Sequence, residues 1–105
     1  MFAVIYSFKV KEGKEAQFKE SWSGLTKLIY EFEGSYGSRL HRKSDTEFLA
    51  YALWPNRQTW EESGEKLPEA ANEHRTNMRD ACFSIETIEE LEVEENLLKE
   101  APFSF

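Results

Sequence analysis

The residues of this chain that could carry chemistry are a histidine–arginine pair and a large set of aromatic rings. His74 and Arg75 are adjacent on a predicted helix, where His74 shares one stripe with Leu67, Ala71, Met78 and Ala81. An imidazole on the apolar face of a helix can accept a phenolic proton, and a guanidinium can stabilise the resulting anion. We take these two residues as the candidate catalytic groups. Two structural alternatives stay open: a core histidine satisfied by one hydrogen bond, and an arginine paired with a surface glutamate.

The segment TEFLAYALW predicts a hollow in the core. Ala50 and Ala52 alternate with Phe48 and Trp54 on one face of a predicted strand. Two small residues between two rings leave space for an aromatic ligand, unless Trp22 or Phe32 packs there. The residues predicted to line this substrate site are Trp22, Ala50, Tyr51, Ala52, Trp54 and Trp60. The hydroxyl groups of Tyr6, Tyr36 and Tyr51 are further candidates for orienting a ligand.

Neither a metal nor an organic cofactor is expected. His41 and His74 are far apart in the sequence, and no Cys or His stands at metal-ligand spacing. Cys82 is the only cysteine, so an internal disulfide is excluded and a buried, unreactive thiol is favoured. The chain has no phosphate-binding glycine loop and no dinucleotide fingerprint.

The elements that must position these residues alternate as strand, helix, strand, strand, helix and strand. Strands are predicted at residues 2–10, 35–43, 46–54 and 84–93, and helices at 18–32, at 57–63 and from about residue 67. One helical stripe is formed by Phe18, Trp22, Leu25, Ile29 and Phe32, with Gly34 as the cap. This order is the split βαβ pattern of the ferredoxin-like fold, an α+β architecture in which helices cover one face of an antiparallel sheet.

The chain is predicted to form one domain over residues 1–105, with its core at 2–95 and a tail at 96–105. Strand 2–10 (FAVIYSFKV) is apolar on both faces, although helices can cover only one of them. A second copy of the chain is the simplest cover for the other face, so we expect a homodimer. The tail rings, Phe103 and Phe105, would then rest over the cavity or on the partner.

The charge balance excludes some classes of partner. A net charge of −7 and a sequence pI ≈ 4.9 repel phosphate backbones and anionic lipids, so neither nucleic acid nor a membrane is expected as partner. No apolar run approaches the length of a membrane span, and the N-terminus lacks the basic start of a secretion signal. We therefore expect a cytoplasmic protein.

Between Gly34 and Trp60 the sequence is similar to a known family. The strings GSYGSRLHR and FLAYALWP, followed by a second Trp, resemble the antibiotic biosynthesis monooxygenase family, and the likeness extends over roughly residues 2–95. The resemblance implies a dimeric α+β barrel of two face-to-face sheets, with a ligand pocket between the helices and the sheet of each subunit. Some members oxidise aromatic polyketides with dioxygen and no cofactor, others cleave haem, and others act on small signalling molecules.

The resemblance carries over to only part of the site. Trp54 matches a Trp that ends the third strand in the cofactor-free oxygenases, but Ala50 stands where they have an Asn. Trp60 takes the place of a Tyr, and an Arg of the second long helix falls near His74 or Arg75.

The pattern of the haem-cleaving branch is absent. That branch has an Asn on the first strand and a Trp and a His on the helices, whereas this chain offers Tyr6 or Ser7, then Ser63 and Asn72. We therefore reject haem cleavage.

Two functions from different classes remain. The first is an antibiotic biosynthesis monooxygenase-like enzyme that oxidises a small aromatic or quinol-type substrate with dioxygen and without a cofactor. The alternative is a non-catalytic homodimer that binds a small hydrophobic molecule, which the Ala50 departure favours. A third reading is a pure interaction module, whose pocket would be filled by its own side chains.

Overall fold

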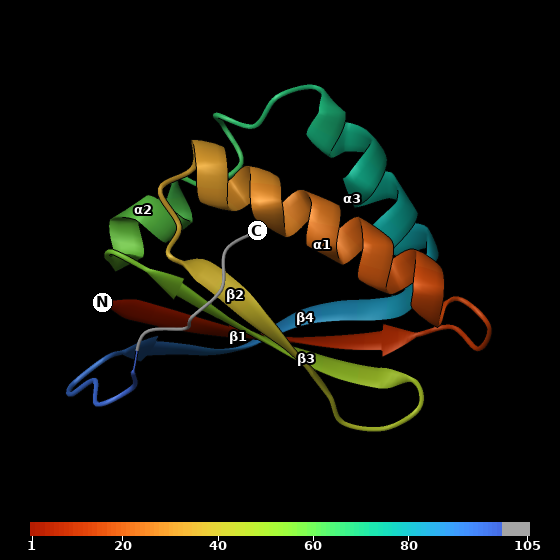
Figure 1. Ribbon diagram of the computed structural model, residues 1–105, viewed down its shortest axis with the longest axis horizontal. Helices are drawn as coiled ribbons and strands as arrows, with labels where there is room; N and C mark the ends of the chain where they lie inside the picture. The colour runs from red at the N-terminus through yellow and green to blue at the C-terminus, as the bar shows by residue number, and fades with distance from the viewer. Residues whose placement is uncertain (100–105) are drawn as a thin grey trace.

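The computed structural model describes residues 1–99, which fold as a four-stranded antiparallel sheet with helices on one face (Figure 1). Its elements, in chain order, are β1 (Phe2–Val10), α1 (Glu15–Phe32), β2 (Gly37–Arg42), β3 (Glu47–Trp54), α2 (Arg57–Glu61), α3 (Ala70–Asp80) and β4 (Cys82–Glu92). The strand order β2-β3-β1-β4 is that of a ferredoxin-like sheet, so the predicted α+β fold class is confirmed.

The two central strands, β1 and β3, carry the core. In their antiparallel register Phe2 lies opposite Trp54, and Val4 lies opposite Ala52. Side chains of a strand alternate between the two faces of the sheet, so these residues all point toward the helices. On β3 the alternation is complete, since every second residue from Phe48 to Trp54 is buried.

Helix α1 lies across the sheet and buries Phe18 and Leu25 against it. The Phe18 ring centroid lies 5.0 Å from that of Phe8 on β1 and 5.1 Å from that of Phe48 on β3, so one helix residue joins both central strands. The chain leaves the helix through Gly34, whose φ of +77° is the left-handed conformation that glycine adopts without strain. The predicted cap is therefore confirmed, although Phe32 at the end of the predicted stripe is 43% exposed.

Helix α3 begins at Ala70, three residues later than predicted. The N–H groups of Ala71 and Asn72 donate to carbonyls three residues earlier, on Pro68 and Glu69. The first turn is therefore tighter than an α-helix and is not counted in the helix proper. Strand β4 begins at Cys82, two residues before the predicted start.

The crossing of α1 and α3 depends on Gly24. A Cβ placed on Gly24 would lie 2.4 Å from Cε1 of His74 on α3. No side chain fits there while the imidazole stays in place, so the ring of His74 fills the seam between the two helices.

Among residues 1–99, no helix lies over the other face of the sheet (Figure 1). Residues of β1 and β3 that point to this face include Ile5, Leu49, Tyr51 and Leu53, and all four are half-buried. We refer to these four residues as the bare sheet face.

Among residues 1–99, no helix has the length and apolar character needed to cross a bilayer.

Candidate functional site

A cavity of about 210 Å³ lies between α1 and the helix-facing side of the sheet. Its wall includes Tyr6 on β1, Trp22 and Ile29 on α1, and Ala52 and Trp54 on β3. The cavity exists because Ala52 presents only a methyl group at a position flanked by rings. A mostly apolar, ring-lined space of this size suits a small aromatic molecule.

Trp54 places an unpaired hydrogen-bond donor in this region. Its side chain is 3% exposed, and its indole Nε1–H is buried without an acceptor among residues 1–99. A buried donor left unpaired costs about 1–3 kcal/mol of stability. Because Nε1 itself has almost no accessible area, a ligand oxygen would recover that free energy only after the indole ring turned its N–H toward the cavity.

Tyr6 supplies a second donor from the facing strand. Its hydroxyl oxygen accepts a hydrogen bond of 2.8 Å from Nε1 of Trp60, whose ring lies 5.6 Å from that of Phe2. The phenol's own proton has no acceptor within the described part of the chain. Burial raises the pKa of Tyr6, against the lowering effect of the Trp60 hydrogen bond, and the charge of Glu90 raises it further. Tyr6 is therefore a neutral donor at physiological pH and not a base.

Helix α2 sets the position of Trp60. Asn56 caps this short helix, since its Oδ1 accepts from the N–H of Thr59 at 2.8 Å. Arg57 holds the helix to the sheet through an Nη1–Oε1 contact of 2.6 Å with Glu90 on β4. Trp60 in turn orients the Tyr6 hydroxyl, so α2 acts on the cavity without lining it.

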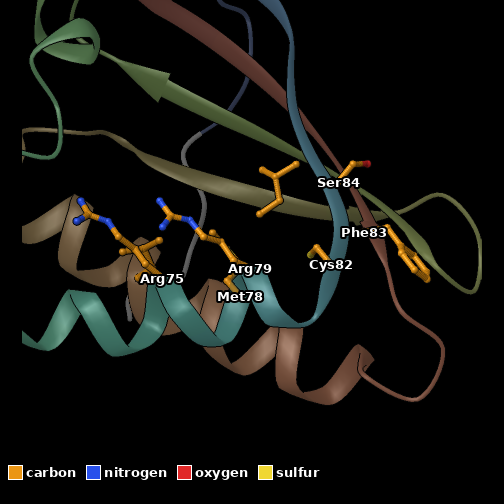
Figure 2. Close-up of a pocket in the computed structure, with 8 residues that line it drawn as sticks. Arg75, Met78, Arg79, Cys82, Phe83 and Ser84 are labelled. Carbon is orange, nitrogen blue, oxygen red and sulfur yellow. The ribbon is translucent and has the colours of Figure 1, made fainter.

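A larger and more open groove of about 500 Å³ lies between α3 and the start of β4 (Figure 2). Arg75 and Arg79 line it from the helix, and Cys82, Phe83 and Ser84 line it from the strand. Three further lining residues, Leu25, Met78 and Ile85, also line the smaller cavity. The groove and the cavity are therefore adjacent, with these three side chains lining both.

The predicted lining residues separate into two groups. Trp22, Ala52 and Trp54 line the cavity, and Ala50 is buried beside Ala52 on the same strand face. Trp60 acts through its hydrogen bond to Tyr6. Tyr51, by contrast, lies on the bare sheet face, because odd-numbered residues of β3 point away from the helices.

The two predicted catalytic residues, His74 and Arg75, lie in different places, and neither lines the cavity. His74 is not among the residues that line the cavity, since its ring packs against Gly24 between α1 and α3. Arg75 lines the groove, and its Nη2 would lie 3.5 Å from a Cβ on Gly64. The sequence analysis did not identify Arg79, although its position one helical turn after Arg75 was a signal that the two guanidinium groups share a face.

The described residues offer little for a metal. Residues 1–99 contain no cluster of three or more His, Cys, Asp or Glu side chains that could hold an ion. Cys82 is buried and unbridged, as predicted, and burial raises the pKa of its thiol to about 11 while Lys11 lowers it slightly. The thiolate that would bind metal or attack an electrophile is therefore scarce at neutral pH.

A family model described as antibiotic biosynthesis monooxygenase matches residues 1–75. The matched part contains Tyr6, Trp54 and Trp60 but ends before Arg79. No curated protein sequence matches this chain.

Solved structures share the fold at low sequence identity. SnoaB, described as a cofactor-independent oxygenase from Streptomyces nogalater, has a TM-score of 0.74 at 15% identity, covering 93% of this chain and 97% of its own. A Caulobacter crescentus protein, provisionally described as an antibiotic biosynthesis monooxygenase, has a TM-score of 0.74 at 17% identity over 90% of each chain. A protein of unknown function from Nitrosomonas europaea has a TM-score of 0.72 at 14% identity over 95% of each chain. At these identities the likeness establishes the fold alone.

The buried phenol of Tyr6 predicts a loss of stability in alkali. The unfolded chain releases this proton near pH ~10, whereas the folded chain holds it to higher pH. The folded state then binds more protons, so the free energy of unfolding falls as the pH rises above about 10. In a spectrophotometric titration we expect one phenol to ionise later than free tyrosine. Tyr6→Phe should remove that step and Tyr36→Phe should retain it; the reverse result would place the buried phenol elsewhere.

Proposed function

The chain belongs to the antibiotic biosynthesis monooxygenase family, and on that premise we propose that it oxidises a small aromatic or quinol-type substrate with dioxygen, without a cofactor. The observation that carries this proposal is the ring-lined cavity beside Trp54, a residue whose buried Nε1–H has no acceptor among residues 1–99. The likeness to SnoaB, described as a cofactor-independent oxygenase, supports the same reaction class.

The two donors suit the electronic demand of such a reaction. A phenol or hydroquinone becomes electron-rich enough to react with dioxygen when its hydroxyl loses a proton and the negative charge left on the oxygen spreads into the ring. An indole N–H and a phenol O–H in a cavity of low polarity stabilise negative charge on that oxygen better than water does, because they are already oriented. In this proposal Trp54 and Tyr6 bind the substrate oxygen, while Trp22 and Ala52 hold its ring.

The proposed mechanism also requires a base that accepts the proton of the substrate hydroxyl. The cavity wall, as far as residues 1–99 form it, contains no His, Asp, Glu or Lys. The base role of His74 and the anion-binding role of Arg75 stay predictions. For His74 to reach a substrate, its ring must leave the seam beside Gly24.

The lack of a base among the described residues of the cavity wall favours a second function. Without a base beside the substrate, and with Ala50 where the related oxygenases carry an Asn, the protein would bind its ligand and return it unchanged. We propose this non-catalytic small-molecule binder as the alternative. The third hypothesis is an interaction module whose pocket is filled by its own side chains. A cavity of about 210 Å³ among the described residues argues against it.

Oxygen uptake with a panel of anthrones and hydroquinones tests the proposed enzyme. We expect turnover that falls about a hundredfold in kcat/KM in Trp54→Phe, because an oriented donor to the developing oxyanion is lost. Trp22→Phe is the matched control: it shortens another ring of the same wall without removing a buried unpaired donor, and should lose less than tenfold. His74→Ala in the same assay tests the predicted base. Tight binding of the panel without oxygen uptake would contradict the enzyme and favour the binder.

We also propose that the protein works as a homodimer joined through the bare sheet face. Half-buried Ile5, Leu49, Tyr51 and Leu53 give this face an apolar centre that no helix covers. A second copy would cover it by packing sheet against sheet.

Light scattering at micromolar concentration tests the dimer. We expect the mass of two chains for the unchanged protein and of one chain for Leu49→Glu, because a carboxylate at the centre of the interface would be buried unpaired. Ala16→Glu, which adds the same charge on the exposed side of α1, should remain dimeric. A monomeric unchanged protein would refute the face-to-face assembly.

A further inference from the structure

We propose that the ligand of this protein is an amphipathic anion, whose ring enters the cavity at Trp54 and whose acidic group binds Arg75 and Arg79 in the groove between α3 and β4. This inference rests on the proposed small-molecule site and adds the class of ligand that it takes. It holds for either proposed function, since an enzyme and a binder would use the same groove.

The first argument is that the cavity and the groove are neighbours, because Leu25, Met78 and Ile85 line both. In this proposal the apolar part of one ligand passes between these side chains into the cavity, while its other end stays in the groove. Together the two spaces are far larger than a single ring requires. A molecule that carries a polar group at one end of an apolar body would fill both.

The second argument is the state of the two guanidinium groups. Arg75 and Arg79 are one helical turn apart on α3 and extend in the same direction from it (Figure 2). Neither has an ion pair or a hydrogen bond within the described residues. Like charges at this spacing destabilise a helix, and this chain carries 20 acidic residues that could have neutralised them. A bound anionic ligand would neutralise the two guanidinium charges and relieve their mutual repulsion.

The residues that line the groove indicate which class of anion would bind there. Guanidinium groups bind planar oxyanions through paired hydrogen bonds, so a carboxylate or a similar oxyanion fits them best. The remaining wall is partly apolar, since Met78, Phe83 and Ile85 contribute to it. A compact, strongly hydrated ion such as free phosphate would leave that apolar wall uncovered, whereas an aromatic acid would cover it.

A matched pair of fluorescent probes tests the inference. Anilinonaphthalene sulfonate and N-phenylnaphthylamine share the same rings, but only the first carries an oxyanion. We expect the sulfonate to bind the unchanged protein more tightly, and its affinity to fall about tenfold in Arg79→Gln, which corresponds to one charge-assisted hydrogen bond. Arg79→Glu should weaken it further, and added salt should weaken it in proportion. The neutral probe should bind all variants alike.

Lys27→Gln, which removes one positive charge from the exposed side of α1, is the control and should change neither affinity. Equal binding of both probes, with no effect of Arg75→Gln or Arg79→Gln, would refute the claim that the ligand is an anion bound by these arginines. The proposed small-molecule site would still stand. Failure of both probes to bind would overturn the site itself, and with it the proposed function.

Discussion

Along β3 the side chains alternate between two faces, and each face has a different neighbour. Toward the helices the strand presents Phe48, Ala50, Ala52 and Trp54, whose small members open a cavity beneath α1. On the opposite face it presents Leu49, Tyr51 and Leu53, which no helix covers. A shift of one residue in the β1–β3 register would exchange these two sets. The ligand site and the proposed dimer surface therefore depend on the same backbone pairing.

The cavity wall is mostly apolar, and its polar residues are Thr26, Ser35, Ser38, Tyr6 and Trp54. Within residues 1–99, the indole N–H of Trp54 has no acceptor, and the Tyr6 hydroxyl accepts from Trp60 while its own proton has no acceptor. Both groups donate and neither is a base at neutral pH, so the site is suited to hold an oxygen that bears negative charge. The arginine pair in the adjoining groove has the same preference for negative charge. In a chain with a net charge of −7, these positive and donating groups are concentrated on one side of the sheet.

The sequence predicted what depends on local periodicity and missed what depends on how elements meet. Alternation and helical spacing were sufficient for the element order, the hairpin and the ring-lined hollow at Ala52 and Trp54. Periodicity also placed His74 on the inward stripe of its helix, but it could not show that the ring ends against Gly24, because that contact depends on the crossing of α1 and α3. Tyr51 was grouped with Ala50 and Ala52 by proximity in sequence, although strand alternation separates them. The Tyr6–Trp60 hydrogen bond joins residues far apart in the chain and left no local signal.

The central claim is that a bound ligand accepts a hydrogen bond from Trp54. The three indole N–H resonances of Trp22, Trp54 and Trp60 can be assigned by single Trp→Phe variants and followed by NMR during titration with an aromatic ligand that carries an acceptor oxygen. We expect the Trp54 resonance to move downfield on binding, because its proton passes from an unpaired to a hydrogen-bonded state. Saturable binding that leaves the Trp54 resonance in place would contradict it.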